Sequence, residues 1–86
     1  MPELCRFNGL IIRMFFDDVK RHYKPHVHVI YNKYKATIAL DGEVLSGKLP
    51  AKEMKRVLAW ITLREDELYE AWTKAVRKED FGKINP

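Results

Sequence analysis

The chain has 86 residues, of which 47% are hydrophobic and 12% aromatic, and its formal charge at pH 7 is +4. This length suits a single small domain and excludes an elaborate multi-substrate enzyme, because one small core leaves no room for a large cleft. The lone Cys5 excludes an internal disulfide and a cysteine-rich zinc site, which favours a cytoplasmic location. No stretch approaches the roughly 18 apolar residues of a membrane helix, so we expect no membrane anchor. We expect no cofactor either.

The surplus positive charge is concentrated in one segment. Residues 49–86 contain eight basic and seven acidic residues, whereas residues 1–48 contain eight and five. Between positions 20 and 35 there is no acid, and tyrosines and histidines alternate with five basic residues: Lys20, Arg21, Lys24, Lys33 and Lys35. This composition is typical of phosphate contacts beside stacking surfaces, and equally of a solvated basic loop.

The first half of the chain is predicted to form strands. The β-branched and aromatic run 10–16 is the length of a strand, and residues 26–31 and 34–40 both alternate in hydrophobicity. Asn32-Lys33 and Asp41-Gly42 have turn composition, so three strands, 26–31, 34–40 and 43–48, should form a meander. We expect the 10–16 strand at one edge of this sheet.

The second half has helical periodicity. Apolar residues recur at the spacing of one helix face from Met54 to Ile61 and again from Leu68 to Val76. The stripe is interrupted at Glu65, which predicts two helices that meet near 63–65 in preference to one long bent helix over 51–78. The tail 80–86 is expected to be a frayed end.

This order of elements predicts a single α+β domain over residues 1–86. An antiparallel meander of about four strands should be covered on one face by the helices. The turns pair Tyr31 with Tyr34, Ile38 with Leu45 and Leu40 with Glu43. They also place His28, Thr37 and Ser46 in one row across three strands. The helix-covered face would then hold Val27, Val29, Tyr31, Ala36, Ile38 and Leu45, packed against Met54, Val57, Leu58, Ile61 and Trp72. The opposite face would hold His26, His28, Lys35, Thr37, Ala39, Val44, Ser46 and Lys48.

Two histidines dominate this opposite face. His26 and His28 share one side of a strand at a spacing of about 6.5 to 7 Å, which suits acid–base chemistry or metal binding. Arg13 would join them if its strand pairs with 26–31, and Lys35 and Arg13 could then neutralise a phosphate. A metal site would need a third ligand, for which His22, Asp17 and Asp18 are the candidates. Structural histidines that bind nothing have the same sequence pattern.

The order of several motifs resembles the bacterial domain-of-unknown-function 4160 family. These motifs are Arg-Met-Phe-Phe-Asp-Asp, Pro-His-x-His-Val, Tyr-x-x-Tyr and Gly-x-Leu-Pro. The family-like positions are Arg13, Asp17, Asp18, Pro25, His26 and His28. One departure is the insertion of Val19 to Lys24, because members usually reach Pro-Pro-His soon after the aspartates. The resemblance implies a compact α+β protein without an established activity, in a gene setting similar to that of toxin–antitoxin pairs.

We therefore predict a cytoplasmic module that binds nucleic acid or a protein partner encoded by an adjacent gene. The first alternative is a small metal-independent endoribonuclease that uses His26 and His28 with Arg13. The second alternative is a metal-binding protein that uses His26, His28 and Asp18. Two tryptophans and exposed sheet edges also favour a homodimer.

Overall fold

The computed structural model describes residues 3–14 and 24–86. Asp17, Asp18, Lys20, Arg21 and His22, all named above as candidates, lie outside the described residues. Within these residues, the predicted order of strands first and helices second is confirmed. The protein has an α+β fold.

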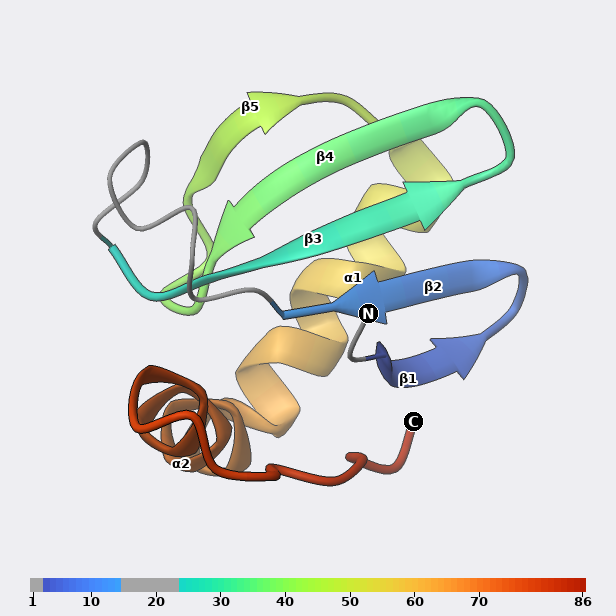
Figure 1. Cartoon of the computed structure of the whole chain (residues 1–86). Helices are drawn as coiled ribbons and strands as arrows, with labels where there is room; N and C mark the ends of the chain where they lie inside the picture. Colours follow the sequence, from blue (N-terminus) through green and yellow to red (C-terminus); the bar gives the residue numbers. More distant parts are fainter. Residues whose placement is uncertain (1–2, 15–23) are drawn as a thin grey trace.

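A five-stranded antiparallel sheet forms the first layer (Figure 1). Its strands lie side by side in chain order, as in a meander. They are β1 (Glu3–Phe7), β2 (Leu10–Arg13), β3 (His26–Tyr31), β4 (Tyr34–Ala39) and β5 (Val44–Gly47).

The strand β1 was missing from the sequence prediction, which also placed β2 wrongly at an edge. β1 pairs with β2 through the tight turn at Asn8-Gly9, where both residues have positive φ, 50° and 79°. Asn-Gly is the dipeptide that favours such a two-residue hairpin turn. β2 is therefore an inner strand, between β1 and β3.

The hairpin of β3 and β4 has the predicted register. Tyr31 pairs with Tyr34 across the turn, and Asn32 has the positive φ of 52° that this turn needs. The buried side chains of this hairpin include the predicted members Val27, Val29, Ala36 and Ile38. Of the remaining predicted members, Tyr31 and Leu45 are half-buried.

The register of β5 differs from the prediction near the turn and agrees further along. Ile38 pairs with Val44 instead of Leu45, and the backbone N–H of Ala39 donates to the Glu43 carbonyl at 2.7 Å, so Leu40 does not face Glu43. A bulge then shifts the pairing by one residue between Ile38 and Thr37. Because of this bulge, Thr37 still pairs with Ser46, as predicted.

Two consecutive helices follow the sheet, and the first of them forms the second layer (Figure 1). α1 (Ala51–Leu63) and α2 (Glu65–Val76) meet at Arg64, at the predicted break. α1 crosses behind the sheet in Figure 1, and its Trp60 ring lies 6.0 Å from the Phe7 ring of β1. No helix in the described part of the chain is long and apolar enough to cross a membrane.

The position of α2 corrects the predicted arrangement of the faces. Trp72 was expected on the opposite side of the sheet from the histidines, but its ring lies 5.2 Å from the ring of His26. α2 turns away from α1 and lies beside the end of the sheet at which β3 begins (Figure 1). At this end both faces of the β3–β4 hairpin are buried, since His26, Val27, Ile38 and Ala39 each have 0% exposure.

The C-terminal segment is packed against the domain, so the prediction of a frayed end is wrong. The Ile84 side chain is only 7% exposed, and its backbone N–H donates to the Leu4 carbonyl of β1 at 2.9 Å. The indole Nε1 of Trp60 donates to the carbonyl of Asn85, also at 2.9 Å. Burial of one isoleucine and these two hydrogen bonds hold the segment across β1 and α1.

Candidate functional site

The outward positions of the strands form a polar surface on the side of the sheet away from α1. Two rows of cross-strand neighbours make it up, and we call them together the polar sheet face. The first row is Arg13, His28, Thr37 and Ser46, and the second is Arg6, Ile11, Ile30 and Lys35. Directly paired residues of an antiparallel sheet have Cβ atoms about 4.5–5.5 Å apart, so members of a row are in reach of one another.

Arg13 occupies the position that the sequence predicted for it. It pairs with His28 because β2 lies directly beside β3. Its side chain is half-buried, and its Nε atom is buried without a hydrogen-bond partner within residues 3–14 and 24–86. On its other side Arg13 pairs with Glu3, whose carboxylate accepts a hydrogen bond from Arg6 at 2.9 Å. That hydrogen bond, more than the nearby charge of Arg13, holds the pKa of Glu3 below its ordinary value.

His28 is the partly accessible histidine of the pair. Its side chain is half-buried in the middle of the first row. Its Nδ1 atom lies 3.4 Å from the hydroxyl of Thr37, a long hydrogen bond between two groups of which either can donate. The direction of this hydrogen bond depends on which ring nitrogen of His28 carries the proton.

His26 is built into the interior. Its side chain has no exposed surface, and its ring contacts both Trp72 and His28 at centroid distances of 5.2 Å. Nδ1 lies 2.7 Å from the carbonyl oxygen of Lys24, which can only accept, so Nδ1 carries the proton and donates. These contacts give His26 a packing role at the junction of β3 and α2, where its side chain does not reach solvent.

The described basic residues of the predicted segment have different surroundings. Lys24 donates to two carboxylates, Asp41 at 2.7 Å and Glu43 at 2.6 Å. The ammonium group of Lys33 lies 5.9 Å from the centre of the Tyr34 ring at the hairpin turn. Lys35 is exposed on the polar sheet face. Lys35 is therefore the lysine of this segment best placed for an anionic partner, since two acids already neutralise Lys24.

The Lys24 ion pairs predict a pH dependence of stability. The hydrogen bond from Lys24 holds the pKa of Asp41 below its ordinary 3.8, and the pKa of Lys24 is correspondingly raised above 10.5. Stabilisation by ionised Asp41 is therefore present above about pH 3.8 and is lost as the pH falls through the lowered pKa; the Lys24 contribution is lost only at strongly alkaline pH. Asp41→Asn should slightly lower the melting temperature at pH 7, and the difference should vanish in strong acid. Equal melting temperatures at pH 7 would contradict this.

The described residues do not form a metal site. Among them, no three His, Cys, Asp or Glu side chains lie close enough together to hold one ion. Of the predicted ligand set, His26 and His28 lie together, while Asp18 lies outside the described residues. The described residues thus supply two neighbouring imidazoles, one of which has its Nδ1 atom engaged by a backbone carbonyl.

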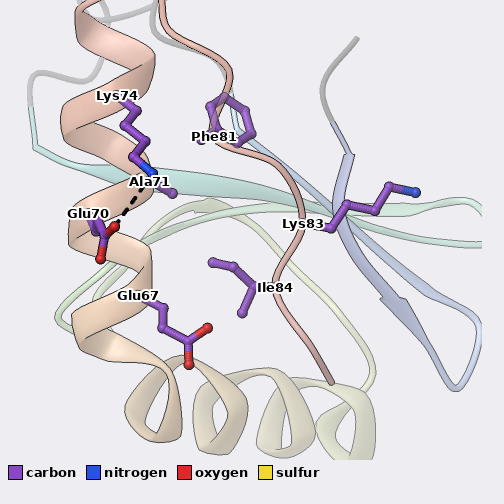
Figure 2. Close-up of a pocket in the computed structure, with 7 residues that line it drawn as sticks. All are labelled: Glu67, Glu70, Ala71, Lys74, Phe81, Lys83 and Ile84. Carbon is purple, nitrogen blue, oxygen red and sulfur yellow. Dashed lines mark ion pairs between the residues drawn. The ribbon is translucent and has the colours of Figure 1, made fainter.

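A hollow lies between α2 and the C-terminal segment (Figure 2). Its volume is about 160 Å³, and its lining includes Glu67, Glu70, Lys74 and Lys83 around Ile84. Lys74 pairs with Glu70 at 3.5 Å and Glu67 pairs with Arg64 at 3.2 Å, while Lys83 points away from α2 (Figure 2). These ion pairs leave little uncompensated charge there, so the polar sheet face is the stronger candidate.

Fold and site together define a small α+β protein with an antiparallel sheet, one polar sheet face and a buried histidine beside an accessible one. The chain matches the family described as Domain of unknown function (DUF4160) over residues 9–73. It belongs to this family. Searches of curated proteins and of solved structures found no match.

The sequence interpretation missed part of the polar sheet face. The sequence interpretation does not include Arg6, because β1 was not predicted. It also does not assign Ile11 and Ile30 to the face that holds Lys35. The signal was available in Asn8-Gly9, whose hairpin places Arg6 beside Ile11. Alternation along β2 and β3 then puts Ile11 and Ile30 on the same side as Arg13 and His28.

Proposed function

We propose that this protein binds single-stranded nucleic acid, RNA in particular, through the polar sheet face. The observation that carries the proposal is the alignment of Arg13, His28 and Thr37 in one row across three adjacent strands, with Lys35 exposed in the next row. Phosphate groups of a nucleic acid are bound by such cations and hydrogen-bond donors.

The balance of charge on this face supports an anionic partner. Its two rows contain three permanent cations, Arg6, Arg13 and Lys35, and Arg6 is paired with the neighbouring acid Glu3, so Arg13 and Lys35 carry the excess positive charge. Ile11 and Ile30 add half-buried apolar surface between Arg6 and Lys35. Unpaired bases present apolar faces that need such a surface, whereas the bases of a duplex are stacked on one another.

Lys35→Glu tests the proposal against a matched control. We expect it to weaken binding of a fluorescently labelled 12-nucleotide RNA about tenfold at low salt, because a phosphate contact is replaced by repulsion. Lys52→Glu changes the net charge equally on the exposed surface of α1 and should leave the affinity nearly unchanged. Fluorescence anisotropy gives both dissociation constants.

The salt dependence provides a second measurement. Two phosphate contacts, from Arg13 and Lys35, predict that the logarithm of the binding constant falls with the logarithm of the salt concentration with a slope of roughly −1.4 for a single strand. No binding by the wild type at low salt, or equal losses in Lys35→Glu and Lys52→Glu, would contradict the proposal. RNA that remains intact during the titration separates binding from the endoribonuclease alternative.

We place this binding in the bacterial cytoplasm, in one member of a toxin–antitoxin-like pair. The support is the resemblance described above and the fit of the polar sheet face to RNA. Co-purification of the protein with the product of the adjacent gene, when the two are expressed together, tests the pairing. A neighbouring product that never co-purifies would count against it.

A further inference from the structure

We propose that Lys35, Ser46 and Lys48 form a subsite for one phosphate group of the RNA, at the β5 edge of the polar sheet face. This inference rests on the proposed function and extends the binding surface to Lys48, which belongs to neither row. It implies that the bound strand leaves the sheet over β5.

Lys48 lies directly beside Lys35. Its backbone N–H donates to the Lys35 carbonyl at 3.0 Å, so the pairing of β4 and β5 continues one residue past Gly47. Both lysines are exposed, whereas the next residue, Leu49, is only 8% exposed, so the Lys48 side chain lies away from the core. Neighbours across two strands have Cβ atoms about 4.5–5.5 Å apart, so the two flexible side chains can bring their ammonium groups to the same small anion.

The protein does not itself neutralise these two lysines. In the part of the chain that the structure describes, the ion pairs involve other cations, and neither lysine side chain takes part in one. Like charges directly opposite each other destabilise a sheet. A phosphate between the two ammonium groups removes this repulsion, so an anionic partner gains more here than at Lys24, which two carboxylates already neutralise.

Ser46 adds a hydroxyl donor to the pair. It precedes Lys48 by two residues, a distance of about 6.5 to 7 Å along a strand, and it pairs with Thr37 on the polar sheet face. Ser46 is exposed, whereas Thr37 is only 7% exposed. Two ammonium groups and one hydroxyl, all open to solvent, therefore border one small area, and each can donate a hydrogen bond to a phosphate oxygen.

The affinity for the labelled 12-nucleotide RNA tests each member of the subsite. Lys48→Ala should weaken binding about fivefold at low salt and Ser46→Ala about threefold, because each removes one donor to the phosphate. Lys48→Arg keeps the charge and should bind like the wild type. Lys55→Ala removes an exposed lysine of α1 and is the matched control, with an affinity near that of the wild type.

The salt dependence shows whether Lys48 contacts a phosphate. With Lys48 as a third contact beside Arg13 and Lys35, the slope for the wild type should be roughly −2.1. Lys48→Ala should return the slope to roughly −1.4, and Lys55→Ala should leave it unchanged. Dispersed amide spectra verify that each variant is folded.

Inorganic phosphate provides a measurement that does not depend on RNA. In nuclear magnetic resonance spectra, phosphate should shift the methylene resonances beside the ammonium groups of Lys35 and Lys48 more than those of Lys55. The subsite is overturned if phosphate shifts Lys48 and Lys55 equally, if Lys48→Ala and Lys55→Ala bind RNA equally well, or if Ser46→Ala binds RNA like the wild type.

The two proposals fail separately. If the wild type binds RNA and Lys48→Ala changes neither affinity nor slope, nucleic-acid binding stands and the subsite is wrong. If phosphate shifts Lys35 and Lys48 but the wild type binds no RNA, the proposed function fails and the anion site alone remains.

Discussion

Replacing Gly47 by alanine should lower the free energy of unfolding by about 2–5 kcal/mol. Gly47 has a φ of 77°, a conformation that residues with a Cβ adopt rarely. A Cβ atom at this position would also overlap the backbone of β4, since it would meet the carbonyl oxygen of Lys35 and lie 2.9 Å from Cα of Ala36. Backbone atoms in the middle of a sheet cannot move away without loss of the ladder between β4 and β5.

Gly42→Ala is the control that separates the two causes. Gly42 also has a positive φ, 98°, but a Cβ there would meet nothing within 4 Å. Chemical denaturation should therefore show a loss of roughly 1–2 kcal/mol for Gly42→Ala and a clearly larger one for Gly47→Ala. Equal losses would mean that close approach of the strands at Gly47 is unimportant. Because Gly47 holds Ser46 beside Thr37, the variant should also disturb the end of the first row of the polar sheet face.

His26→Ala should destabilise the protein by about 3 kcal/mol, whereas His28→Ala should cost about 1 kcal/mol. The His26 ring is fully buried against Trp72, and its Nδ1 donates to the Lys24 carbonyl at 2.7 Å. Alanine would leave a cavity and an unsatisfied carbonyl at the junction of β3 and α2. The His28 ring is half-exposed, so its loss removes less packing.

This difference decides how a role in RNA processing should be tested. Simultaneous replacement of both histidines would combine loss of the fold with loss of the site. His28→Ala alone, verified by thermal denaturation, isolates the accessible imidazole, while His26→Ala reports on stability. A melting temperature of His26→Ala equal to that of the wild type would contradict the structural role of His26.

Local patterns were sufficient for most of the elements. Alternation in 26–31 and 34–40, with a turn at Asn32, predicts the central hairpin and its register, which the structure has residue for residue. The apolar stripe and its interruption at Glu65 predict two helices that meet near Arg64. These features depend on neighbours within a few residues, which a sequence displays directly.

Errors arose where a residue's environment comes from distant parts of the chain. The tail 80–86 has the composition of a frayed end, yet Ile84 is buried because β1 and α2 both lie beside it. Leu45 does not pair with Ile38, because a bulge shifts the register of β5. The number of residues between the two strands does not reveal such a bulge. Trp72 has the periodicity of a residue packed under the sheet, but α2 lies beside the sheet's end.

The sequence by itself therefore determined the fold class, the central hairpin, the two helices and the alignment of His28 with Thr37, because periodicity and turn composition are local properties. Only the tertiary structure decided which of the two histidines is buried and which residues lie beside Arg13. Alternation assigns His26 and His28 to the same face, but the position of α2 buries one and leaves the other partly accessible. Arg13 became their neighbour because β2 is an inner strand, and pairing between distant strands depends on how the whole chain packs.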